Sequence, residues 1–152
     1  MTQPGSELIG AAYHEAGHII VALHYGLEVG LIVVRENGDG GSDISPTRHL
    51  PFLDRVAVCM AGGAAQQHFQ TPSMDYAMLA DYAMVCTFTP EMTGEEREAA
   101  IEKAFVLAGN IIQQNSDEVA RLAKILIARR SINLNEVEPP VRLKSTSVGS
   151  KR

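Results

Sequence analysis

Residues 7–25 constrain the fold of this chain most, because their apolar side chains recur at the spacing of an amphipathic helix. Ser6 can cap this helix at its start, and Gly26 is placed to end it in the left-handed conformation. Two histidines, His14 and His18, lie four residues apart within it. At the helical rise and rotation their rings project about 6 Å and about 40° apart. The helix must therefore bury its apolar stripe and present two neighbouring imidazoles on the opposite face.

Glu15 completes a His-Glu-x-x-His pattern, which is the pattern of zinc peptidases. The two imidazoles can reach one metal ion from the same face of the helix. Glu15 projects about 60° from His18, beside the metal, where a carboxylate can take a proton from metal-bound water. The pattern predicts a Zn2+ site with His14 and His18 as ligands and Glu15 as the catalytic acid and base.

A zinc site of this type needs a third protein ligand and leaves the fourth position to water. His24 has the spacing of the third histidine in one zinc-peptidase class, but that class requires a glycine where this chain has Val21. Without the glycine the helix continues, and His24 points about 120° away from His18. We therefore do not expect His24 to bind the metal.

Two aspartates remain as candidates for the third ligand. Asp75 lies in the first turn of a predicted helix, directly after the break at residues 71–73, and a carboxylate there can project toward another element. Asp81 lies near the middle of the same helix. Asp75 is the preferred ligand, and Asp81 is the alternative.

The rest of the chain predicts a mainly helical α+β domain. Residues 31–34 have the composition of a strand, and residues 36–49 read as a long loop or an irregular hairpin because they combine glycine and proline without periodicity. Breaks, caps and helix-forming composition predict further helices at residues 51–69, 74–87, 93–114 and 117–130, with a final turn at 134–137. We expect one domain over residues 1–138, with a small sheet and a C-terminal helical bundle, and a disordered basic tail over residues 139–152.

Composition and charge exclude several classes of function. No apolar run approaches the roughly 20 residues of a membrane span, and the first residues lack the pattern of a secretion signal. The formal net charge is −5 although residues 139–152 contain four basic residues and no acidic one. An acidic body without a basic stripe repels phosphate backbones. We expect a cytoplasmic protein that contacts neither membrane nor nucleic acid.

Several segments resemble the peptidase domain of the FtsH-type ATP-dependent zinc proteases. They are AYHEAGHIIVALHYG followed by VGLIVV, the apolar helix 54–65 with its glycine pair and Ala-Ala, and the closing segments 119–126 and 132–137. The resemblance covers residues 8–138. It implies a mainly helical zincin fold, with His14 and His18 as zinc ligands, Glu15 as catalytic acid/base and an aspartate after the glycine-pair helix as third ligand.

Three departures from the family pattern stand out. Gln66 and Gln67 follow Ala-Ala where the family usually has two glutamates. The segment between Gly63 and Asp75 is shorter than in the family. The chain also has no P-loop and no room for an ATPase domain, so we expect the peptidase domain to stand alone.

The expected function is that of a zinc-dependent metalloendopeptidase that hydrolyses flexible or unfolded polypeptides without ATP. The strand at residues 31–34 either pairs with an extended peptide substrate or is an ordinary strand of the sheet. A second hypothesis is a regulatory or adaptor module that binds peptides without cutting them, although such a module does not need Glu15. A small helical assembly protein would require the motif to be accidental. The two closing helices are the expected contact surface for self-assembly or for a partner protein.

Overall fold

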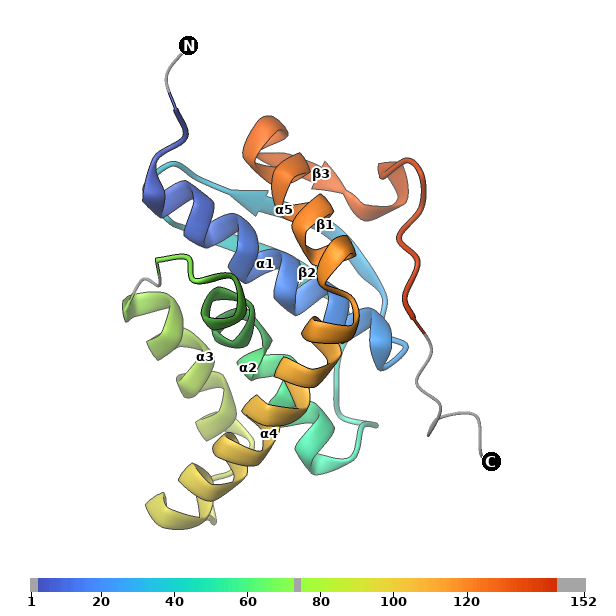
Figure 1. The fold of residues 1–152 in the computed structure, drawn as a ribbon. Helices are drawn as coiled ribbons and strands as arrows, with labels where there is room; N and C mark the ends of the chain where they lie inside the picture. The colour runs from blue at the N-terminus through green and yellow to red at the C-terminus, as the bar shows by residue number, and fades with distance from the viewer. Residues whose placement is uncertain (1–2, 73–74, 145–152) are drawn as a thin grey trace.

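The structure is a computed structural model that describes residues 3–72 and 75–144, without the side chains of residues 75 and 76. Its elements, in chain order, are α1 (Ser6–His24), β1 (Val29–Val34), β2 (Gly40–Ile44), α2 (Phe52–Phe69), α3 (Asp75–Thr87), α4 (Gly94–Gln114), α5 (Ser116–Arg129), β3 (Ser131–Asn133) and a 3-10 turn (Leu134–Glu136). Figure 1 shows α1 in the middle of the molecule, with the sheet behind it. The prediction of a mainly helical α+β fold with a small sheet is confirmed.

The sheet is antiparallel and has the strand order β2-β1-β3. Residues 36–49, left open as a loop or a hairpin, contain the second strand of a hairpin. A turn joins β1 to β2, in which the Arg35 amide donates to the Asp39 carbonyl at 2.7 Å and Gly38 has a φ of +94°. Glycine adopts this backbone conformation without steric cost. The three-residue strand β3 is too short to show a period of two in the sequence.

The position of β1 corrects one expectation about the substrate. Residues 31–34 belong to the central strand, whose two edges pair with β2 and β3. Its main-chain hydrogen-bonding groups are therefore already used, and an extended peptide cannot pair with it. Among the described residues, no strand pairs with the outer edge of β2.

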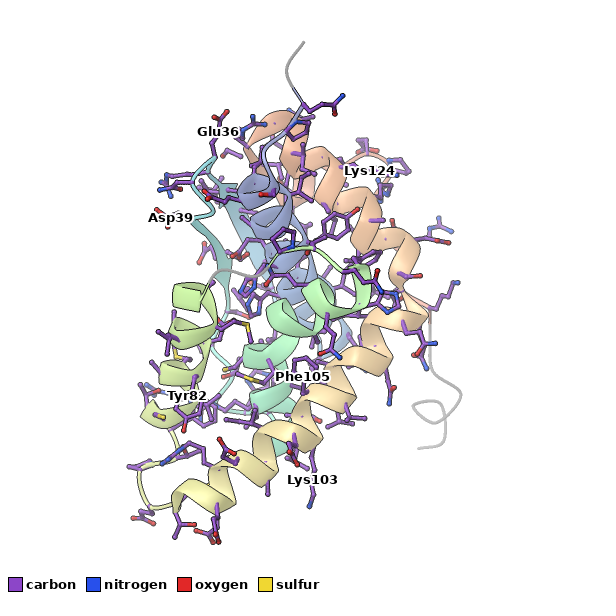
Figure 2. All side chains as sticks on the ribbon, turned by 60° about the vertical axis from the view of Figure 1, so that its left-hand side comes forward. Glu36, Asp39, Tyr82, Lys103, Phe105 and Lys124 are labelled. Atoms are coloured by element: carbon purple, nitrogen blue, oxygen red, sulfur yellow. The ribbon has the colours of Figure 1, made fainter. Side chains whose placement is uncertain are left out.

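A close approach of α1 and α2 forms the centre of the core. Gly17, the glycine of the His-Glu-x-x-His segment, makes this possible, because a Cβ there would lie 2.5 Å from Ala65 Cβ and 2.6 Å from the Ala61 carbonyl oxygen. Helix α5 covers another side of α1, and α4 packs along α2. Figure 2 shows Phe105 of α4 on the side of that helix that faces α2. None of the described helices combines the length and apolar character that a membrane crossing requires.

Most apolar side chains of the two closing helices, α4 and α5, pack against the hydrophobic core of the domain. The expectation of a contact surface depends on eight apolar residues of these helices, and of these only Val106 is exposed, at 61%. The other seven are buried in the core or packed against it: Ile101, Phe105, Ile111, Val119, Leu122, Ile125 and Leu126. Self-assembly through these helices stays a prediction. The exposed apolar surface of α4 and α5 that could support it is small.

The packed chain continues beyond residue 138. The Arg142 amide donates to Glu118 Oε1 at 2.8 Å, and the Lys144 amide donates to Asn115 Oδ1 at 2.7 Å. Val141 and Leu143, which alternate with these two residues, pack against the core. The first part of the expected tail, residues 139–144, therefore lies along the start of α5, whereas residues 145–152 are outside the described part of the chain.

Candidate metal centre

Three side chains from two helices converge beside α1. The Nε2 atoms of His14 and His18 lie 3.1 Å apart, and Asp81 Oδ2 of α3 lies 3.0 Å from the first and 3.3 Å from the second. These atoms form the group among the described residues that could hold a metal ion. His14 is buried, whereas His18 and Asp81 are half-buried, so the triangle lies at the edge of the core.

The dimensions of this triangle fit zinc. Four ligands at zinc bond lengths of about 2.0–2.1 Å in a tetrahedron lie about 3.3 Å from one another. The three measured separations are within a few tenths of an ångström of that value. Two imidazoles and one carboxylate are also a common ligand set of catalytic zinc, which keeps its fourth position open.

Hydrogen bonds on the far side of each ring aim the histidines at this point. His18 Nδ1 donates to the Val58 carbonyl of α2 at 2.8 Å, and His14 Nδ1 lies 2.6 Å from Gln66 Oε1. A neutral ring that donates from Nδ1 carries its lone pair on Nε2. Both lone pairs thus face each other and Asp81 Oδ2, which is buried and has no donor among the described residues when the rings are neutral. Such an arrangement needs a cation.

The pKa values of the metal-free site also indicate that a positive charge is favoured between these atoms. Burial favours the neutral form of His18, but the contact with Asp81 outweighs it and raises the pKa to about 9. Burial likewise favours the protonated form of Asp81, but its contacts with His14 and His18 lower its pKa to about 2. Without a metal the site therefore keeps a proton on His18 at neutral pH, in the position that a metal ion would neutralise.

Glu15 is buried beside the triangle, under the edge strand. The Ser42 hydroxyl of β2 donates to Glu15 Oε1 at 2.6 Å. Gly40, on the same face of β2, leaves the room that Glu15 occupies, because a Cβ there would lie 3.3 Å from Oε2. The Glu15 carboxylate is thus next to the three candidate ligands without being one of them.

Two cavities flank the triangle and share four lining residues, Glu15, Gly40, Ala80 and Asp81. One, of about 390 Å³, extends from His14 toward Arg35 and Asp39 at the turn of the hairpin. The other, of about 300 Å³, extends from His18 along β2 and is bordered by Ile44, Val58, Cys59 and Met84. Figure 2 shows Asp39 at the hairpin, on the same side of the molecule as α3. Together the cavities form a cleft that crosses the ligand triangle between β2 and α3.

Cys59 borders the apolar cavity but does not join the ligand set. Burial, with a further contribution from the Asp81 charge, raises the pKa of its thiol to about 12. The thiol is therefore protonated at neutral pH in the metal-free protein and behaves as a small apolar side chain.

Neither a scan against protein-family models nor a search of curated protein sequences finds a match to this chain.

The structure brings together His14, Glu15 and His18, as the sequence predicts. Asp81, the alternative third ligand, is the aspartate that reaches the two histidines. Asp75 begins α3, but its side chain lies outside the described residues, and the three-ligand set is complete without it. His24 is absent from the cluster, as expected, and its ring packs on Tyr25.

Two residues of α2 belong to the site although the sequence does not identify them. Gly62 lies against the His14 ring, which a Cβ at this position would strike. Gln66, one turn further along the same helix face, contacts His14 Nδ1. Their only signals in the sequence are a glycine pair and two adjacent glutamines in the same helix, and neither pair indicates which histidine it would touch.

Proposed function

We propose that this chain is a zinc-dependent metalloendopeptidase of the zincin type, in which His14, His18 and Asp81 hold the ion and Glu15 is the catalytic acid and base. The observation that carries the proposal is the ligand triangle of zinc dimensions with a buried carboxylate beside it, inside a cleft. The resemblance of residues 8–138 to the FtsH-type peptidase domain supports the same function. A zinc ion bound there supplies Lewis-acid chemistry at an amide carbonyl and makes water more acidic.

Glu15 moves the proton in this reaction. It takes a proton from the attacking water as the new carbon–oxygen bond forms, and it returns that proton to the amine nitrogen as the carbon–nitrogen bond breaks. The Ser42 hydroxyl occupies one carboxylate oxygen and holds the group in place, which leaves the second oxygen for proton transfer. Because Glu15 is buried, its position is set by its neighbours before a substrate enters.

The outer edge of β2 is the place for an extended substrate. Residues Gly40–Ile44 run along the cleft, and an added strand would hydrogen-bond to their free main-chain groups. Such pairing needs a flexible or unfolded segment and gives affinity with little sequence preference. The cavity beside His18 would then take an apolar side chain, since Ile44, Val58 and Met84 border it.

The test combines metal content with cleavage of an unfolded protein such as casein. We expect the purified chain to bind about one Zn2+ and to cleave casein without ATP. Glu15→Gln should keep the metal and abolish cleavage, because the amide has the same shape but cannot act as a base at neutral pH. Glu102→Gln, on the exposed face of α4, is the matched control and should cleave like the wild type.

Two outcomes would contradict the proposal. Undiminished cleavage by Glu15→Gln would remove the assigned role of this carboxylate. A wild-type protein that binds zinc and unfolded peptides but hydrolyses nothing would instead be the non-cleaving regulatory or adaptor module.

A further inference from the structure

The side-chain amide of Gln66 links the metal centre to the connection between α2 and α3. Its Nε2 atom lies 2.5 Å from the Pro72 carbonyl oxygen, and its Oε1 atom lies 2.6 Å from His14 Nδ1. A carbonyl oxygen can only accept a hydrogen bond, so the Gln66 amine must be the group that faces Pro72. The amide orientation is thereby determined, and Oε1 is left to accept from His14.

This orientation also determines the tautomer of His14. Because Oε1 is an acceptor, the ring nitrogen opposite it must carry the proton, and Nε2 keeps the lone pair that a metal needs. Gln66 is 3% exposed and His14 is 4% exposed. Because both side chains are buried, a reversed Gln66 amide or the other His14 tautomer would leave polar groups without hydrogen-bond partners.

Helix α1 fixes the outer end of this chain of bonds. Gly10 packs so closely against the Pro72 carbonyl that a Cβ at position 10 would collide with its oxygen. The carbonyl is therefore confined between α1 and the Gln66 side chain.

We propose that Gln66 is a positioning residue that sets the metal-binding tautomer of His14, and that the Pro72 carbonyl makes an amide, rather than a carboxylate, the required group at position 66. The consequence for zinc affinity rests on the proposed metal site, whereas the consequence for the tautomer does not.

A carboxylate could satisfy only half of this arrangement. Carboxylates commonly orient metal-binding histidines from behind. Here the second oxygen of a glutamate would face the Pro72 carbonyl oxygen at hydrogen-bond distance with no proton between them. The position of the Pro72 carbonyl therefore requires a side chain at residue 66 that can both donate and accept a hydrogen bond, as glutamine does.

The first measurement is the His14 tautomer in the metal-free protein, from the imidazole nitrogen shifts in an NMR spectrum at a pH where the ring is neutral. The wild type should show the proton on Nδ1. Gln66→Met, which fills the space without an acceptor, should move the proton mainly to Nε2. A wild-type ring that carries its proton on Nε2 would overturn the proposal without any variant, even if a variant failed to fold.

The second measurement is the Kd for Zn2+ by competition with a chelator. Gln66→Met and Gln66→Glu should each bind zinc about 10- to 100-fold more weakly than the wild type. Gln67→Met and Gln67→Glu are the matched controls, because the neighbouring amide is exposed, and their Kd should stay at the wild-type value. Wild-type affinity in Gln66→Glu would show that the amide is not required.

These two readouts separate this inference from the proposed function. A wild type that binds no zinc but holds His14 in the Nδ1-protonated form would contradict the metal site and support the role of Gln66. A wild type that binds zinc, with a tautomer that Gln66→Met does not change, would keep the metal site and overturn the role of Gln66.

Discussion

Asp81 contributes the only negative charge of the ligand triangle, and it reaches the histidines from the middle of α3. We predict that Asp81→Asn lowers zinc affinity by more than about 100-fold, because the amide keeps the shape but loses the charge and most of the ligand strength. Asp75→Asn should bind zinc like the wild type. Competition titration of both variants checks the assignment, and the reverse result would make Asp75 the third ligand.

The pKa of His18 predicts how the stability of the metal-free protein depends on pH. Its folded value of about 9 lies above the ordinary value of 6.5, despite burial, because Asp81 favours the charged ring. The stabilisation by His18 should therefore be complete below pH 6.5 and disappear as the pH rises through 9. Urea unfolding in a chelator should show the wild type losing its advantage over His18→Gln across this interval.

Zinc should reverse this pH dependence. The ion must displace the proton from His18, so the stabilisation by a fixed excess of free zinc should grow between pH 6.5 and 9. An advantage of the metal-free wild type over His18→Gln that stays constant from pH 6 to 10 would contradict the assigned ion pair between His18 and Asp81.

At the scale of elements, α2 supports the site through a residue without a side chain. We predict that Gly62→Ala lowers zinc affinity strongly, because its Cβ would push the His14 ring out of the triangle. The matched control is Gly109→Ala in α4, where an added Cβ meets nothing within 4 Å. That control should keep zinc affinity and raise the free energy of unfolding by about 0.5–1 kcal/mol.

Circular dichroism and zinc titration of the two alanine variants test this prediction. Gly62→Ala should retain its helical spectrum, since the collision is with one ring at the edge of the core. If it binds zinc as tightly as Gly109→Ala, then the close contact between Gly62 and His14 does not position the ligand.

The register of the β1–β2 hairpin determines which residues of β2 face α1 and which edge of the sheet is available for pairing. Ile32 of β1 pairs with Ser42, and Val34 pairs with Gly40, so both residues of β2 face α1. This register places the Ser42 hydroxyl on Glu15 and leaves the outer edge of β2 beside the cleft. The prediction of peptide pairing therefore moves from residues 31–34 to β2.

At the scale of the whole molecule, the proposed function makes access to the β2 edge the property that would decide which proteins are substrates. A folded protein has its main-chain hydrogen bonds already made, so only its unfolded fraction, about 10⁻³ or less, can lie along the strand. We predict that the rate of ATP-independent cleavage follows the unfolded fraction of the substrate. A small two-state protein and a set of its destabilised variants measure this, and equal rates for all of them would contradict edge pairing as the mode of entry.

Of the six large apolar side chains that are exposed in the described part of the chain, three lie on α3 and one, Val106, lies on the closing helices. Leu79, Tyr82 and Met84 are 67%, 38% and 56% exposed, and Met84 also borders the apolar cavity. Figure 2 shows Tyr82 at the margin of the molecule, on α3. The exposed apolar side chains of α3 therefore adjoin the cleft.

The sequence alone determined the features that depend on one helix. The spacing of His14, Glu15 and His18 is a local property, because four residues make one helical turn whatever surrounds them. The helix bounds were also predictable to within one or two residues, since Gly26 and the Thr93–Glu96 capping box act within a single turn of their helices.

Only the tertiary structure decided which groups from elsewhere meet that helix. Three residues reach the site from different elements. Asp81 of α3, Gln66 of α2 and Ser42 of β2 lie 63, 48 and 24 residues from His18 in the sequence. The rotation of α3 about its axis selects Asp81, and the register of the hairpin selects Ser42. The rotation and the register both depend on how whole elements pack. A shift of one residue in either would present a different side chain to the site, so a local sequence pattern cannot determine which side chain is presented.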